Sequence, residues 1–149
     1  MGLEQEFVAR LIIAAVLGSL LGLERSLAGK HAGMRTYAMV SLGSCLFVVI
    51  GELSSLQLSA FIGFNPVQIA ASVVIGIGFI GAGLSALHGE HPELTTASGI
   101  WVAAGVGMAS GFGFYPIAAA SVMLGLVIFW VFAKIEHRMN ERYGIKHEE

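Results

Sequence analysis

Residues 67–87 read VQIAASVVIGIGFIGAGLSAL and contain no charged side chain. A helix needs about 20 predominantly apolar residues to cross the hydrocarbon core of a membrane. This run reaches that length without help from its flanks. Only lipid or neighbouring protein can surround a helix that is apolar on every side, so we predict a transmembrane helix here.

Four further apolar segments accompany this helix. Each is long enough to cross the membrane only if flanking residues are counted with it. They are Phe7–Leu23, Tyr37–Leu53, Ser98–Phe112 and Pro116–Ala133. The segment Ser98–Phe112 is rich in Gly and Ala and is the least hydrophobic, so we expect protein to surround it. The sequence therefore predicts an all-α polytopic membrane protein of about five short transmembrane helices. It divides into a membrane domain, 1–133, and a charged cytoplasmic tail, 134–149.

The composition excludes several other classes of protein. Hydrophobic residues make up 56% of the chain and charged residues 12%, which leaves too little polar surface for a soluble domain of this length. A net charge of -2 without a basic stripe argues against binding of nucleic acid. The acidic residues Glu4 and Glu6 stand where a secretory signal would be basic, so the first segment is expected to be a retained helix.

The basic residues predict the orientation in the membrane. Seven lie either between the first two apolar segments or in the tail: Arg25, Lys30, Arg35, Lys134, Arg138, Arg142 and Lys146. Arg10 alone lies near the opposite end, behind Glu4 and Glu6. Five crossings then place the N-terminus outside and the C-terminus in the cytoplasm.

Small residues recur at four-residue spacing along the predicted helices, which places them on shared faces and permits close helix packing. The glycines of these ladders are Gly18, Gly22, Gly76, Gly78, Gly81, Gly83, Gly99, Gly107 and Gly111. These small residues either pack the helices within one bundle or form the contact between copies of the chain in a homo-oligomer. The spacing allows both. The aromatic residues Tyr37, Trp101, Trp130, Tyr115 and Tyr143 are expected at the membrane interfaces.

Charged residues meet where the first two segments are joined. Glu24 and Arg25 follow the first segment, and Arg35 precedes the second. Charges at a membrane edge pair or extend towards water. They form either an interfacial ion pair with positive-inside anchors or a polar cluster at a cytoplasmic entrance.

Four blocks of sequence, in order, resemble the MgtC/SapB family of bacterial inner-membrane proteins. They are Gly22–Arg25 with Gly29–Thr36, then Gly76–Gly83, then Leu94–Val102, and then Gly105 to Gly107 with Gly111. His31 and Met34 replace the usual Pro and Leu of the charged loop. Many members carry a soluble cytoplasmic domain after the helices, whereas this sequence stops after a short tail, so any role of that domain is not carried over.

The resemblance implies a multi-pass protein of the bacterial inner membrane that is linked to growth at low magnesium and, in pathogens, to virulence. It also implies action on a larger membrane complex, the ATP synthase. Within the motifs it points to a functional polar cluster of Glu24, Arg25, Lys30, Arg35, Thr95 and Thr96. The two threonines either line that cluster or cap the fourth helix from just ahead of it.

Residues that could bind metal gather in one loop: His88, Glu90, His91 and Glu93. Their spacing matches no defined metal site, and Mg²⁺ prefers oxygen ligands, so a solvated loop is the simpler interpretation. All five histidines fall outside the predicted spans, which removes the base that an intramembrane hydrolase needs. We expect no enzyme activity and no cofactor, with Mg²⁺ as a possible ligand.

Three functions remain open. One is a regulator that acts by helix–helix contact with a larger complex, and another is an oligomeric cation transporter or channel with Glu24 in its path. The third is a factor for the assembly or stability of another transporter. A transporter is expected to keep carboxylates in mid-membrane. The chain has no Asp, and every Glu lies near a helix end or in a loop, which favours the regulator.

Overall fold

The computed structural model describes residues 2–57, 66–87 and 94–143, and these ranges contain helices and no strand. The helices are α1 Leu3–Leu27, α2 Met34–Gln57, α3 Pro66–Leu87, α4 Leu94–Gly111 and α5 Tyr115–Tyr143. The prediction of an all-α protein with five helices is confirmed.

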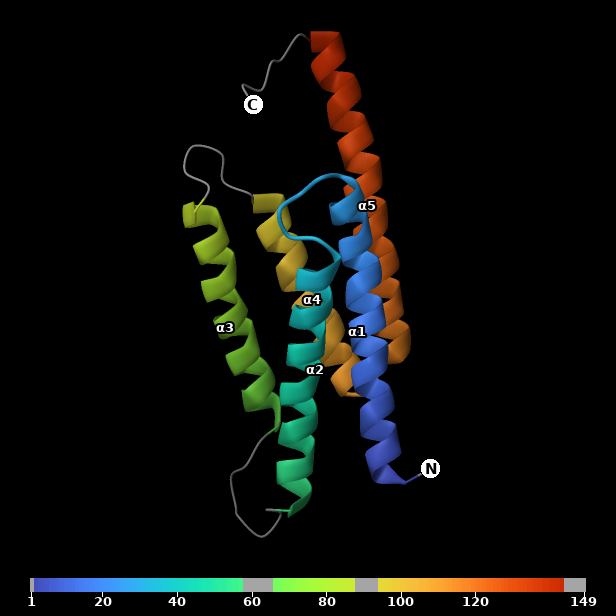
Figure 1. Cartoon of the computed structure of the whole chain (residues 1–149), viewed down its shortest axis with the longest axis vertical. Helices are drawn as coiled ribbons and strands as arrows, with labels where there is room; N and C mark the ends of the chain where they lie inside the picture. The colour runs from blue at the N-terminus through green and yellow to red at the C-terminus, as the bar shows by residue number, and fades with distance from the viewer. Residues whose placement is uncertain (1, 58–65, 88–93, 144–149) are drawn as a thin grey trace.

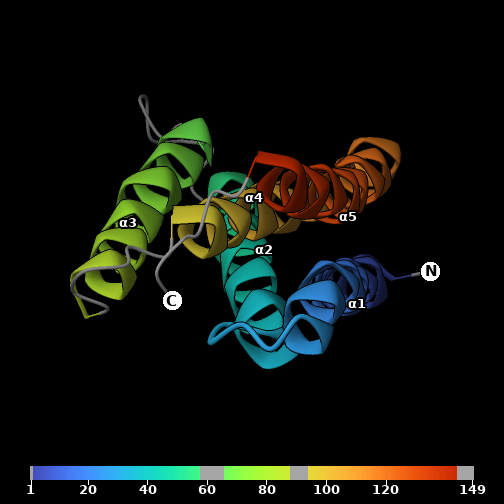
Figure 2. The same cartoon turned by 90° about the horizontal axis from the view of Figure 1, so that it is seen from above.

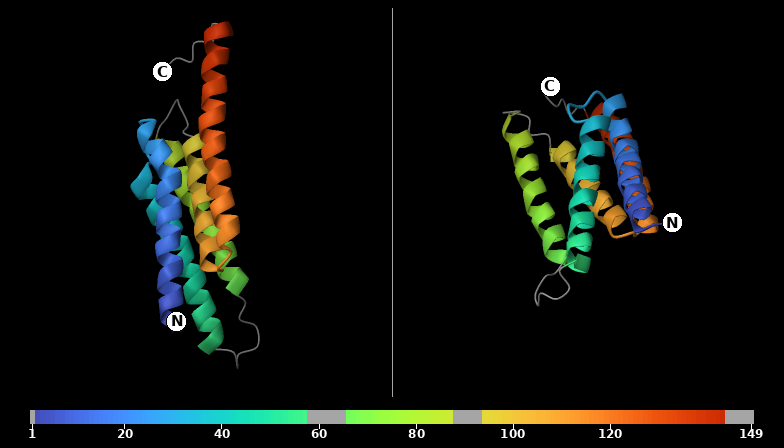
Figure 3. Two further views of the ribbon diagram at one scale, coloured as in Figure 1. Left: turned by 90° about the vertical axis from the view of Figure 1, so that its right-hand side faces the viewer. Right: turned by 60° about the horizontal axis from the view of Figure 1, so that its bottom comes forward.

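The five helices run alternately up and down, so the two chain termini lie at opposite ends of the bundle (Figure 1). The α1–α2 connector and the C-terminal part of α5 share one end, which we call the basic end because Arg25, Lys30, Arg35 and Lys134 lie there. The positive-inside rule assigns the basic end to the cytoplasm. α5 extends past the other helices at this end (Figure 3) and crosses the predicted boundary at residue 134 without a break.

The helices are longer than the apolar segments that predicted them. α1 continues to Leu27, and α4 begins at Leu94 rather than at Ser98. Polar side chains at a membrane edge reach water or partners, so a helix can continue through them. Glu24, Arg25 and Arg35 are consequently helical residues and do not belong to a loop.

α4 is the central helix and contacts each of the other four, as the view along the bundle shows (Figure 2). The other four helices are long and apolar enough to cross a membrane, whereas α4 does not meet the same criterion. Half of its residues are buried, among them Gly99, Ala103, Gly107 and Gly111. A helix surrounded by protein needs less hydrophobic surface than one that faces lipid, so the expectation for this segment is confirmed.

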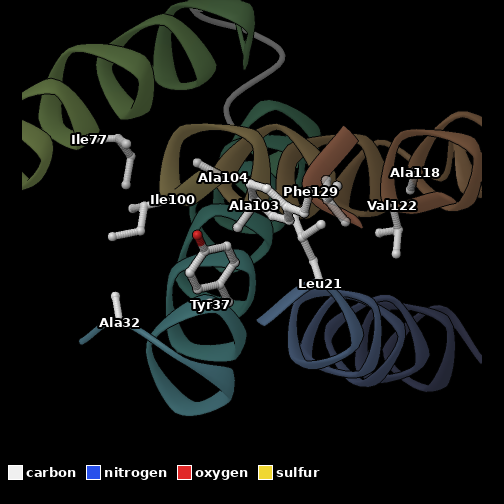
Figure 4. Close-up of a cluster of buried hydrophobic side chains, with 11 residues drawn as sticks. Leu21, Ala32, Tyr37, Ile77, Ile100, Ala103, Ala104, Ala118, Val122 and Phe129 are labelled. Carbon is white, nitrogen blue, oxygen red and sulfur yellow. The ribbon is translucent and has the colours of Figure 1, made fainter. Parts of the chain in front are cut away.

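Most buried apolar side chains form one cluster around α4 (Figure 4). Leu21 and Tyr37 are fully buried there, and Phe129 of α5 belongs to the same cluster. The Tyr37 hydroxyl donates a hydrogen bond of 3.3 Å to the carbonyl oxygen of Thr96. The prediction that Tyr37 is an interfacial aromatic is therefore wrong, because this side chain joins α2 to α4 inside the bundle.

α1, α2 and α4 meet most closely at Ser41. Its hydroxyl donates a 2.7 Å hydrogen bond to the carbonyl oxygen of Ala14. A Cβ atom on Gly18 would lie 2.6 Å from the Ser41 Cβ, and one on Gly107 would lie 2.7 Å from the Ser41 carbonyl carbon. Only glycine leaves room for these backbones, as small residues do in membrane helices generally.

The glycines thus fall into two groups. Those of α1 and α4 that the spacing singled out are opposed by atoms of a facing helix: Gly18, Gly22, Gly99, Gly107 and Gly111. In α3, a Cβ atom added to Gly76, Gly78 or Gly83 would meet no described atom within 4 Å, and one on Gly81 would reach the Ala97 Cβ at 3.7 Å. Within the described ranges, Gly76, Gly78 and Gly83 therefore do not face another helix closely.

Candidate functional site

A polar pocket of about 890 Å³ opens at the basic end between α1, α4 and α5. Its charged and polar lining residues are Glu24, Arg25, Lys30, Thr95, Thr96, Glu136, His137 and Asn140. Ile128, Phe129 and Phe132 supply its apolar wall. The pocket brings together five of the six residues of the predicted polar cluster.

The centre of the pocket is an ion pair between neighbouring residues of α1. Arg25 donates from Nε to one Glu24 carboxylate oxygen at 2.5 Å and from an Nη to the other at 2.8 Å. The Arg25 guanidinium also lies 4.0 Å from the centroid of the Phe129 ring, and its side chain is buried. Such a bidentate pair with a cation–π contact fixes both side chains and leaves Glu24 little freedom to bind a cation.

The two threonines lie at the pocket in different ways. α4 begins at Leu94, so Thr95 and Thr96 are inside its first turn and not ahead of it. The interpretation of these residues as N-caps is therefore wrong. Thr95 is exposed to the pocket, whereas Thr96 is buried beneath it.

Arg35 lies outside the pocket. It is an exposed residue in the first turn of α2, and within the described part of the chain it takes part in no ion pair. Arg35 is therefore the one member of the predicted polar cluster that does not line the pocket.

Three pocket residues come from the segment that the sequence assigned to a tail: Glu136, His137 and Asn140. They line the pocket because α5 continues as a helix past the other helices. His137 Nε2 lies 3.3 Å from the Glu141 carboxylate, one turn further along. Continued helical spacing of polar residues after Ala133 is the signal that could have placed them here.

A second charged cluster lies at the opposite end of the bundle around Arg10. Its guanidinium lies 2.6 Å from Glu6 and 2.6 Å from Glu52 of α2, and it donates a 2.7 Å hydrogen bond to the carbonyl oxygen of Gly111. Arg10 is buried and also lies over the Phe7 ring. It thereby ties α1, α2 and the last turn of α4 together.

Metal ligands do not gather in the described part of the chain, where no three His, Cys, Asp or Glu side chains could share an ion. His88, Glu90, His91 and Glu93 lie outside the described residues. Glu24, Glu136 and His137 line the pocket, but the Glu24 carboxylate is already held by Arg25. The geometry favours a fixed, internally neutralised polar surface over a ready-made cation site.

The outer face of α3 is turned away from α2 and α4. It carries the small residues Gly78, Ala82 and Ala86 at four-residue spacing, next to Ile75 and Phe79, which are 77% and 82% exposed. Among the described helices, α3 contacts α2 and α4 alone. This face therefore presents a small-residue ladder of the kind that packs membrane helices, without a partner in the described part of the chain.

Comparison with known proteins shows one consistent relationship. The MgtC family model matches residues 11–138. The Escherichia coli K12 protein named "Putative magnesium transporter YhiD" is 37% identical over 145 residues, which cover 95% of this chain and 67% of that protein. No solved structure matches.

Two further relatives carry other names. "Protein SapB" of Bacillus subtilis is 33% identical over 141 residues, covering 89% of this chain and 61% of its own length. "Protein MgtC" of Salmonella typhimurium LT2 is 35% identical over 136 residues, covering 91% of this chain and 56% of its own length. The chain thus spans between about half and two thirds of the curated relatives that it matches.

Proposed function

The chain belongs to the MgtC family, and on this basis we propose that it is a non-enzymatic membrane protein that supports adaptation to low magnesium by contacting a larger membrane complex. It is a multi-pass protein of the bacterial inner membrane, with four helices that are long and apolar enough to cross it. The ATP synthase is the proposed complex, as the family resemblance implies. A part in virulence is proposed on the same ground.

The outer face of α3 is the observation that carries this proposal. A Cβ atom added to Gly78 would meet no described atom within 4 Å, whereas one added to any ladder glycine of α1 or α4 would meet a facing helix. In lipid, helices associate through such small residues and close backbone approach. A helix of a partner complex that packs on Gly78, Ala82 and Ala86 would use a face that the bundle itself leaves open.

The closed interior supports the same proposal. α1, α2 and α4 meet at Ser41 without room for a side chain, and the buried charged residues, Arg10 and Arg25, lie towards opposite ends of α1. Between these ends the described core holds no charged side chain, so a cation that crossed a single copy there would meet neutral groups alone.

A cation transporter is the second candidate, and the polar pocket is the observation that favours it. Glu24 lies in this pocket at the basic end, where an ion would enter or leave. An ion there would have to compete with Arg25 for the carboxylate. The resemblance of the chain to a protein named a putative magnesium transporter also supports this candidate.

Substitution of leucine for Gly78 is expected to abolish the regulatory effect while leaving the protein folded. A Cβ atom at this position meets no described atom of its own chain, but the leucine side chain separates a partner helix from α3. The measurement is ATP-driven proton pumping in inverted membrane vesicles, with the protein at matched abundance. Wild type should lower pumping, and Gly78→Leu should restore most of it.

The matched control is Ala120→Leu, which adds the same side-chain type to an exposed site on α5. It should inhibit as wild type does. If Gly78→Leu still inhibits pumping fully, the outer face of α3 does not contact the partner complex. If wild type itself does not lower pumping, the ATP synthase is not the partner.

A further inference from the structure

A second cavity lies between α2 and α3 and differs from the polar pocket in being almost wholly apolar. It measures about 540 Å³, a size typical of sites that hold a small molecule. Its lining residues are Met39, Val40, Gly43, Ser44, Phe47, Ile69, Ser72, Val73, Gly76, Ile77 and Ile80. We call it the α2–α3 groove.

Two glycines widen the groove, one on each wall. Within the described ranges, a Cβ atom added to Gly43 of α2 or to Gly76 of α3 would meet nothing within 4 Å. The end away from the basic end is closed, because a Cβ atom on Gly51 would lie only 2.8 Å from the Ile69 side chain. α2 and α3 lie further apart towards the basic end (Figure 1).

Arg35 stands at that wider end. It precedes Met39, Gly43 and Phe47 by steps of four residues, so it continues the α2 row that lines the groove. Met39 is one turn, or roughly 6 Å, deeper in the membrane. Arginine side chains on a helix point towards its N-terminus, which here means towards the cytoplasmic membrane surface.

We propose that the α2–α3 groove binds an anionic phospholipid, with an acyl chain between Gly43 and Gly76 and the headgroup phosphate on Arg35. The charges are complementary, since Arg35 is exposed and has no carboxylate partner in the described ranges. A planar guanidinium binds phosphate through two hydrogen bonds. Basic sites between transmembrane helices on the cytoplasmic side bind anionic headgroups in this way.

This proposal gives Arg35 a role that is independent of Glu24 and of the partner complex. The groove and the outer face of α3 are different sides of that helix, because Gly76 lines the groove and Gly78 does not. Binding of lipid in the groove would fix α3 against α2 and leave Gly78, Ala82 and Ala86 available to a partner.

Native mass spectrometry of the purified full chain with phosphatidylglycerol or phosphatidylcholine of equal chain length tests the proposal. Wild type should retain phosphatidylglycerol in preference. Arg35→Gln should reduce that preference about fivefold, as expected for one cation at a membrane surface. Arg138→Gln removes an equal charge from an exposed site on α5 and should change nothing.

Two further variants test the groove itself. Gly43→Leu and Gly76→Leu fill it, and their Cβ atoms meet no atom of the described residues within 4 Å. Both variants should therefore remain helical and monodisperse yet retain neither lipid. Equal retention of the two lipids by wild type, or an unchanged preference in Arg35→Gln, would overturn the proposal. So would a dimer mass that disappears in Gly43→Leu, because a second copy would then occupy the groove.

Discussion

Replacing Gly107 with alanine is expected to lower the free energy of unfolding by about 3 kcal/mol, at the upper end of what overpacking a core costs. The new methyl group would lie 2.7 Å from the carbonyl carbon and 2.8 Å from the Cα of Ser41, and closer still to the Ser41 carbonyl oxygen. These are backbone atoms, so no side-chain rotation relieves the collision. α2 and α4 would have to separate, although α4 is the helix that holds the bundle together.

Gly105→Ala is the matched control, two residues earlier in α4. A Cβ atom there meets no atom of the described residues within 4 Å, so this variant should lie within about 1 kcal/mol of wild type, with alanine favoured by its helix propensity. Unfolding in mixed micelles of rising SDS content, followed by circular dichroism, measures both variants. Equal stability of Gly107→Ala and Gly105→Ala would show that the close crossing at Ser41 is not a feature of the folded protein.

Replacing Arg10 with glutamine is expected to cost about 2–3 kcal/mol of unfolding free energy. The change removes hydrogen bonds to two carboxylates and to the Gly111 carbonyl oxygen, which join three helices. Breaking a buried ion pair costs about 3–5 kcal/mol. Here the Glu6 and Glu52 side chains are 50% and 36% exposed, so water offsets part of the loss.

A double-mutant cycle isolates the link between α1 and α2. Arg10→Gln, Glu52→Gln and the pair should give a coupling of about 1 kcal/mol, since the two side chains are in direct contact. Arg138→Gln on the exposed part of α5 removes the same charge and should be neutral. If the coupling energy is zero, or if Arg10→Gln is as stable as wild type, Arg10 does not hold the helices together and its charge faces water.

The number and order of the helices followed from composition, because long apolar segments have few stable alternatives in lipid. The low hydrophobicity of Ser98–Phe112 also indicated its central place, which α4 confirms. The rows of small residues at four-residue spacing were harder to interpret. Four-residue spacing shows that Gly78 and Ala82 share a face, but it does not show whether that face meets another helix.

The long-range partners of polar residues could not be predicted. Arg10 stood one turn inside an apolar helix, a position that itself signals a partner, yet Glu52 lies 42 residues away in sequence. Tyr37 follows polar residues and resembled an interfacial aromatic, but it is fully buried, with α4 at its ring and hydroxyl and α1 at its Cβ. An interfacial ion pair was one of the two interpretations open for Glu24, Arg25 and Arg35, and the structure pairs Glu24 with Arg25. The contact of Arg25 with Phe129 and the α5 wall of the pocket depend on the folded bundle, so the sequence did not predict them.

We expect this protein to act by contact and not itself to carry magnesium across the membrane. The measurement is Mg²⁺ uptake into proteoliposomes that contain the purified protein alone, with Glu24→Gln alongside and circular dichroism to show that both proteins are helical. Neither protein should exceed the leak of empty liposomes. Uptake by wild type that Glu24→Gln abolishes would instead make the protein a transporter and place the polar pocket on its transport path.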